Sequence, residues 1–296
     1  EGPTQYPLTI ENCGDEVVFD AAPERVLTLA PNTTEILLAL GLADHMAGMI
    51  GAKDQLLPEL QAAAEPVEVI TESAFPYPSR EVVLAADPDL LLSGYGGDFT
   101  EGAYGTRESY AELEIQSMYL TDACESDGGV TLDTTYQDIL TLGRIFDVPQ
   151  AAADLVNQMQ ADAASVQPAD PPVSVFVFGG DAVEENITIG GGGLLDDMIT
   201  RAGGSNIFAD LPNSGHNNSV SMEDIVARNP EVIVIIHYRA LPAEEIIAYM
   251  KADPSWSQVS AVQNDRFVII DVTSTVPGVR NGRAIAELSA GFAGGA

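Results

Sequence analysis

The chain has 296 residues, 46% of them hydrophobic, which is enough for one large domain or two moderate domains with packed cores. Its 45 acidic and 12 basic residues give a formal net charge of -33, which would repel a phosphate backbone and argues against nucleic acid as a partner. The sequence contains no apolar run long enough to predict a membrane span, and no leader precedes Glu1, so we expect a cytosolic protein or one whose leader has been removed.

The N-terminal segment predicts a β-hairpin and then a strand-helix-strand unit. Apolar and polar residues alternate over 6–11 and 16–20, on either side of a turn at 12–15. A buried strand over 25–30 stops at Pro31, and Asn32 or Thr33 can cap the helix that follows, which Gly41 closes. With the next strand at 45–51, this order predicts a parallel sheet.

The pattern continues to two consecutive helices. Ser79 can cap a short helix that Pro88 ends, and a strand at 90–92, a Gly/Tyr-rich loop at 94–105, a helix at 108–113 and a strand at 116–120 follow. One helix is predicted to end near Phe146 and another to begin at Pro149. The second helix is a candidate strut between two lobes; the alternative is a long surface helix within one domain.

Two cysteines, Cys13 and Cys124, lie far apart in a chain without metal-type Cys/His spacing. An even count of two predicts a single disulfide and an oxidising compartment. Two buried free thiols are the alternative.

The second half of the chain repeats the pattern of the first. A strand over 173–178, glycines at 190–193 and a helix over 194–202 precede a segment at 221–236 that matches 79–92 by residue class. In both segments a serine stands two positions before a glutamate, and that glutamate stands seven positions before a proline, as Glu81 and Glu223 show. We interpret this as an internal duplication.

The duplication predicts an α/β fold with two lobes, each built on a mostly parallel sheet, joined by a single long helix. The predicted domains are 1–147, a linking helix over 148–170, and 171–296. Ligands of such sheets bind beyond the carboxyl ends of the strands, and a cleft between two domains is the usual place for a pocket. Polar and aromatic residues follow the predicted strands at Asn32, Tyr95 to Gly97, Gly179 to Asp181, and His237 to Arg239.

Five segments and the predicted strut together resemble one known family. The segments are PERVLTLAPNTTEILLALG at 23–41, REVVLAADPDLLLSG at 80–94, LLDDMITRAGGSNIF at 194–208, SMEDIVARNPEVIVI at 221–235 and WSQVSAVQNDRFVIID at 256–271. They are similar to the substrate-binding proteins of ABC importers that carry ferric siderophores, haem and cobalamin, the class III periplasmic binding proteins with a helical backbone.

The resemblance implies a monomeric, extracytoplasmic, non-enzymatic protein, with or without a lipid anchor, that carries metal only as part of a bound chelate. Its partners would be the chelate and the permease of an ABC importer. Glu81 and Glu223 match the glutamates that pair with permease arginines in this family. The alternative is that a glutamate in a first helical turn simply interacts favourably with the helix dipole.

The ligand expected first is a ferric siderophore, with a corrinoid, haem or another bulky cofactor as alternatives. A cleft hydrolase with paired carboxylates is the alternative from another class. His237 has a second interpretation as a core histidine, His45 is expected to be structural, and Trp256 to lie in the core. The candidate ligand-binding residues are Asn32, Tyr77, Tyr95, Tyr104, Arg107, His216, Asn217, His237, Tyr238, Arg239 and Arg280.

Overall fold

The computed structural model describes residues 2–124, 129–180, 182–183, 185–212, 218–238 and 241–294. The chain divides into two compact units. Unit 1 comprises Glu1–Ser126, Asp133–Gln158 and Pro277–Val279, and unit 2 comprises Asp127–Leu132, Met159–Val276 and Arg280–Ala296. Within the described ranges, none of the helices has the length and apolar character that a membrane crossing requires.

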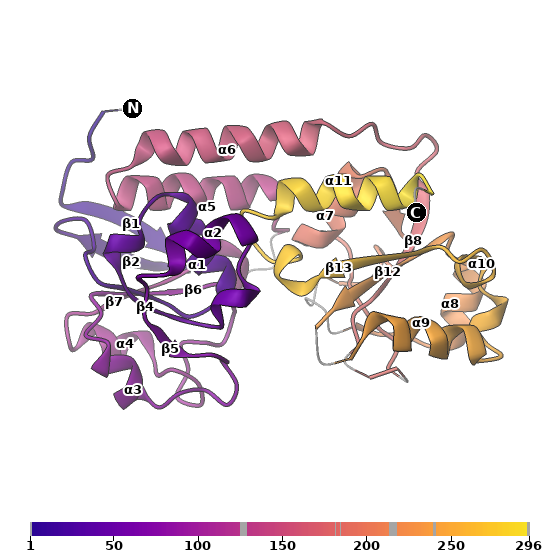
Figure 1. The fold of residues 1–296 in the computed structure, drawn as a ribbon, viewed down its shortest axis with the longest axis horizontal. Helices are drawn as coiled ribbons and strands as arrows, with labels where there is room; N and C mark the ends of the chain where they lie inside the picture. Colours follow the sequence, from indigo (N-terminus) through magenta and orange to yellow (C-terminus); the bar gives the residue numbers. More distant parts are fainter. Residues whose placement is uncertain are drawn as a thin grey trace. The chain divides into compact units, whose positions relative to one another are not determined.

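Unit 1 is built on a five-stranded parallel sheet in the order β5-β4-β3-β6-β7, as the strand-helix-strand pattern predicted (Figure 1). Its strands are β3 Val26–Thr28, β4 Met46–Ile50, β5 Val69–Thr71, β6 Leu90–Ser93 and β7 Gln116–Tyr119. Its first four helices are α1 Pro31–Ala39, α2 Pro58–Ala64, α3 Arg80–Ala85 and α4 Arg107–Ala111. Because all five strands are parallel, their carboxyl ends meet at one edge.

The predicted cap of helix α1 was wrong. The helix begins at Pro31, and the N-cap residue is Ala30, without a side-chain hydrogen bond. Proline at the first helical position needs no N–H partner, so the helix starts earlier than a polar cap would place it. Thr33 lies in the first turn and donates its hydroxyl to the Ala30 carbonyl at 2.8 Å. The end was predicted correctly: Gly41 follows the helix with φ +78°.

The predicted hairpin and the predicted disulfide are both present. Strands β1 Leu8–Asn12 and β2 Asp15–Phe19 pair antiparallel around a short turn. Asn12 fastens the hairpin to β7, since its Nδ2 donates to the Tyr119 carbonyl at 2.8 Å and its Oδ1 accepts from the Tyr119 N–H at 3.0 Å. Cys13 is bonded to Cys124 across a sequence separation of 111 residues.

The two helices predicted before residue 166 are α5 Leu132–Ile145 and α6 Pro149–Ala164. They approach closely, because a Cβ added at Gly143 would lie 2.3 Å from the Cβ of Ala152. The division between the units falls inside α6, after Gln158. The predicted linking helix therefore contributes residues to both units, and the predicted boundaries at 147 and 170 stay predictions.

Unit 2 has a four-stranded parallel sheet in the order β10-β8-β12-β13. Helices α7 and α11 cover one face, and α8, α9 and α10 cover the other (Figure 1). Trp256 is 2% exposed in this second core layer, as expected. The elements are β8 Val173–Phe178, β10 Gly204–Asn206, β12 Val232–His237, β13 Phe267–Asp271, the small pair β9 Ile187–Thr188 and β11 Asn218–Ser219, and the helices α7 Leu194–Arg201, α8 Met222–Arg228, α9 Ala243–Ala252, α10 Ser260–Gln263 and α11 Asn281–Phe292.

Candidate functional site

An aromatic ladder lies in the loops that follow β5 and β6, at the carboxyl edge of the sheet of unit 1. The rings of Phe75 and Tyr77 are 4.8 Å apart, and those of Tyr77 and Tyr104 are 4.9 Å apart in an edge-to-face arrangement. Phe75 is 70% exposed, whereas Tyr104 is 1% exposed. The backbone of Phe75 is fixed by Ser73, whose hydroxyl donates to its carbonyl and accepts from its N–H. The ladder thus holds an exposed aromatic ring in a defined position.

A buried carboxylate supports this ladder from the loop after β6. Asp98 is 3% exposed and accepts hydrogen bonds from the Ser93 hydroxyl at 2.6 Å and from the Tyr77 hydroxyl at 3.4 Å. Burial raises the pKa of Asp98 to about 6, although both hydroxyl groups favour the charged form. The Tyr104 hydroxyl is buried and finds no hydrogen-bond partner among the residues that the structure describes, and burial, with nearby Asp98, raises its pKa.

The same loop also lines a pocket of about 610 Å³. Phe99 and Tyr119 stand edge to face with centroids 4.7 Å apart, and the Phe99 N–H donates to the Tyr119 hydroxyl at 2.9 Å. The disulfide forms part of the wall. The lining residues are Cys13, Gly14, Gly97, Phe99, Thr100, Arg107, Tyr119, Ala123 and Cys124.

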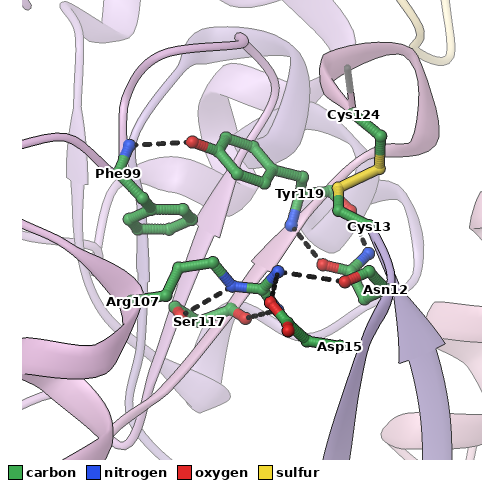
Figure 2. Close-up of polar contacts among 8 residues, drawn as sticks. All are labelled: Asn12, Cys13, Asp15, Phe99, Arg107, Ser117, Tyr119 and Cys124. Atoms are coloured by element: carbon green, nitrogen blue, oxygen red, sulfur yellow. Dashed lines mark hydrogen bonds and ion pairs between the residues drawn. A yellow bond between two sulfur atoms is a disulfide. The ribbon is translucent and has the colours of Figure 1, made fainter. Parts of the chain in front are cut away.

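Arg107, one of the predicted ligand-binding residues, joins this pocket to the hairpin (Figure 2). Its Nη1 donates to the Asn12 carbonyl and to Asp15 Oδ2, both at 2.9 Å, and its Nη2 donates to the Ser117 carbonyl at 3.0 Å. The guanidinium group is therefore engaged with its own unit, and Asp15 neutralises its charge.

The carboxyl edge of the sheet of unit 2 brings together three polar residues. His237 and Asp271 are register partners at the ends of the neighbouring strands β12 and β13. Arg280 lies 3.5 Å from Asp271, measured from Nη1 to Oδ1, and its side chain is 11% exposed. Tyr238 follows His237 directly, and both are half-buried. The sequence placed His237, Tyr238 and Arg280 in one candidate set, and the fold places them at one sheet edge.

The other predicted residues are placed as follows. Asn32 is fully buried and its Nδ2 donates to the Pro277 carbonyl at 2.8 Å. Tyr95 is 37% exposed just beyond β6. His45 contacts the Pro23 carbonyl and the Phe146 ring, as a structural histidine would. The predictions for His216, Asn217 and Arg239 concern positions outside the described residues.

Four residues of these surroundings were missed by sequence reasoning: Phe75, Asp98, Phe99 and Tyr119. Asp98 and Phe99 follow the Gly96-Gly97 pair beyond a predicted strand, which is a position where side chains gather at a sheet edge. That position was a usable signal for these two residues. No local pattern marks Phe75, because Tyr104, which completes the ladder by packing against Tyr77, approaches it only in the fold.

Comparison with known proteins places this geometry in a family. A cobalamin-binding protein of Halobacterium salinarum is 26% identical over 235 residues, which are 77% of this chain and 58% of that protein, so the match spans little more than half of that relative. A vitamin B12-binding protein of Yersinia pestis is 28% identical over 218 residues, covering 72% of this chain and 70% of the relative. The crystal structure of an ABC-type Fe3+-hydroxamate transport system from Saccharomonospora viridis superposes with a TM-score of 0.83 at 26% identity, covering 97% of this chain and 99% of that one. The family model described as periplasmic binding protein matches residues 26–272, and the chain belongs to this family.

Proposed function

We propose that this protein is the extracytoplasmic substrate-binding protein of an ABC importer, that it captures a metal chelate, and that it delivers the chelate to the permease without chemical turnover. A ferric siderophore, a corrinoid and haem are the candidate ligands. The cobalamin and hydroxamate names of the relatives support this range.

The observation that best supports ligand capture is the fixed, exposed Phe75 ring at the carboxyl edge of the sheet of unit 1. A large aromatic side chain that is 70% exposed leaves apolar surface in water, and here it is held by ring contacts and by Ser73. Such a preorganised ring loses little conformational entropy when an apolar ligand face covers it. It is therefore suited to contact a bulky ligand.

The observation that supports delivery is the equivalent position of Glu81 and Glu223. Each is the second residue of its helix, α3 or α8, and each is exposed. Two equivalent carboxylates, one in each unit, suit a two-fold symmetric partner that offers arginines. We assign both to permease docking.

A thermal-shift screen of the purified protein against ferric siderophores, cobalamin and haemin tests ligand capture. A ligand present at about 100 times its Kd stabilises the folded state by about 2.7 kcal/mol, which is a measurable rise in Tm. We expect one class to raise Tm and to be recovered chemically unchanged. Recovery of a cleaved product would support the cleft hydrolase instead, and no shift with any class would contradict the proposal.

A further inference from the structure

Within the described ranges, Arg107 beside the sheet of unit 1 and Arg280 at the carboxyl edge of the sheet of unit 2 are already paired with carboxylates. Arg107 is 2.9 Å from Asp15, and its side chain is 15% exposed. Arg280 is 3.5 Å from Asp271 and is 11% exposed. Both arginine side chains are thus largely buried.

An anionic ligand would have to compete for these guanidinium groups. To reach Arg107 it would replace bonds to the Asn12 and Ser117 carbonyls or approach Asp15, whose carboxylate would then face the ligand at short range. A charge-assisted bond gained by the ligand would replace one that the protein already has, and like charges would be brought together.

The other negative charges of the protein also disfavour an anionic ligand. Asp98 lies buried beneath the aromatic ladder, and the whole chain carries a net charge of -33. A field of this sign attracts cations and repels anions over about a Debye length, roughly 8 to 10 Å at ordinary ionic strength.

We infer that the ligand is a metal chelate of neutral or positive net charge, and that chelates with a strongly anionic periphery are rejected. This inference rests on the proposed function, since it concerns the ligand of the same site.

The test is a binding panel on the wild-type protein with chelates of different charge: cationic ferrioxamine B, neutral ferrichrome, neutral cyanocobalamin, a trianionic ferric tris-catecholate, and haemin with its two propionates. We expect at least one neutral or cationic chelate to bind about tenfold or more tightly than both anionic ones. If ferrioxamine B binds, its affinity should fall as salt rises. An anionic chelate that binds as tightly as the best of the others overturns the inference alone, whereas no binding by any chelate overturns the proposed function and with it the inference.

A pair of matched variants tests whether the Arg107–Asp15 pair causes the rejection of anionic chelates. Asp15→Asn leaves the Arg107 charge uncompensated, so the affinity for the tris-catecholate should rise about threefold while that for neutral chelates stays constant. Asp210→Asn removes a comparable carboxylate, the partner of Arg228, and should change neither affinity. Equal effects of the two variants on the tris-catecholate would contradict the role of the Arg107–Asp15 pair.

Discussion

The helix-proline-strand segments of the two units follow the same backbone path. In α3-β6 and in α8-β12, the residue before the proline has a left-handed conformation, with φ 51° at Asp87 and φ 44° at Asn229. The acidic residue after the proline binds the start of the neighbouring strand in each unit. Asp89 accepts from the backbone N–H groups of residues 24 and 25, and Glu231 accepts from the N–H and the hydroxyl of Ser174.

The side chains that fasten the two segments differ. In unit 1, Arg25 donates to the carbonyls of Ala86 and Asp87 at the end of α3. In unit 2, Arg228 of α8 itself forms an ion pair with Asp210 and lies over the Phe208 ring at 4.3 Å. The C-terminal ends of α3 and α8 are thus held in equivalent positions by different residues.

The two units hold some of these features in common, and others are interchangeable. Backbone path, proline and the exposed glutamate in the first turn are common to both, whereas the capping and anchoring side chains are not. Glu81 and Glu223 both lie in the first turn of a helix and so share the interaction with the helix dipole. The permease docking proposed above would account for the repeated glutamate as well, and variants of these two residues distinguish the two explanations.

The largest effect is expected from replacing both glutamates. Glu81→Ala with Glu223→Ala should abolish importer-dependent uptake, because both contacts with the permease are lost, while ligand affinity stays unchanged. Each single variant should retain reduced uptake, measured with labelled ligand in vesicles that contain the permease.

Matched controls for this experiment are Glu108→Ala and Glu244→Ala. Both residues are exposed and lie in the first turns of α4 and α9, so they share the interaction with the helix dipole. Their variants should support normal uptake. If uptake survives the double variant, or if the control variants lose it equally, the docking assignment is wrong.

The disulfide distinguishes unit 1 from unit 2, because both cysteines belong to unit 1. Replacing Cys13 and Cys124 by serine should lower the free energy of unfolding by about 2 to 4 kcal/mol in oxidising buffer, since the bond closes a long loop in the unfolded chain. Denaturant unfolding measures the loss. In reductant the variant and the wild type should unfold alike, and a difference that persists there would assign the effect to packing.

The residues that follow β6 in unit 1 differ from those that follow β12 in unit 2. Because of the buried carboxyl group of Asp98, which follows β6, stability should depend on pH. Its pKa of about 6 in the folded state exceeds the ordinary value of 3.8, so the folded state retains the proton that the unfolded state releases between these values. Asp98 therefore costs stability as pH rises through this window. Asp98→Asn should stabilise the protein by about 1 to 3 kcal/mol at pH 7, with no gain near pH 4. A gain that is independent of pH would contradict the titration.

Much of this architecture was predictable because local rules determine it. The hairpin turn, Pro149 at the start of α6 and Gly41 after α1 are local signals, and the structure confirms the elements they predicted. The error at the α1 cap has a local cause as well. Two rules competed, and proline at the first helical position prevailed over the polar residues that follow it.

The candidate site was less predictable, because its properties depend on long-range contacts. Arg107 lines a pocket, and its predicted role in ligand binding stays a prediction. Its pairing with Asp15 was not predicted, because it depends on the hairpin docking beside β7. Phe75 and Asp98 were missed because their surroundings depend on Tyr77 meeting Tyr104 and Asp98, which lie in a different loop. Sequence periodicity predicts elements, and it does not predict which side chains meet between them.

The smallest effect is expected at Ser79 and Ser221, which occupy equivalent positions in the repeated segment but differ in their contacts. Ser221 caps α8, because its Oγ accepts from the Asp224 N–H at 3.0 Å, whereas Ser79 makes no such bond in α3. A hydrogen bond with Ser79 instead lowers the pKa of Glu81. Ser221→Ala should therefore cost about 1 kcal/mol of stability.

Ser79→Ala should leave stability nearly unchanged and raise the pKa of Glu81, which is measurable by NMR titration of the carboxyl carbon. Because a charged Glu81 is what a permease arginine would bind, the same variant should weaken uptake only in acidic medium. An equal loss of stability in both serine variants would show that Ser79 is also a cap, and the two segments would then be equivalent in their fastening as well as in their path.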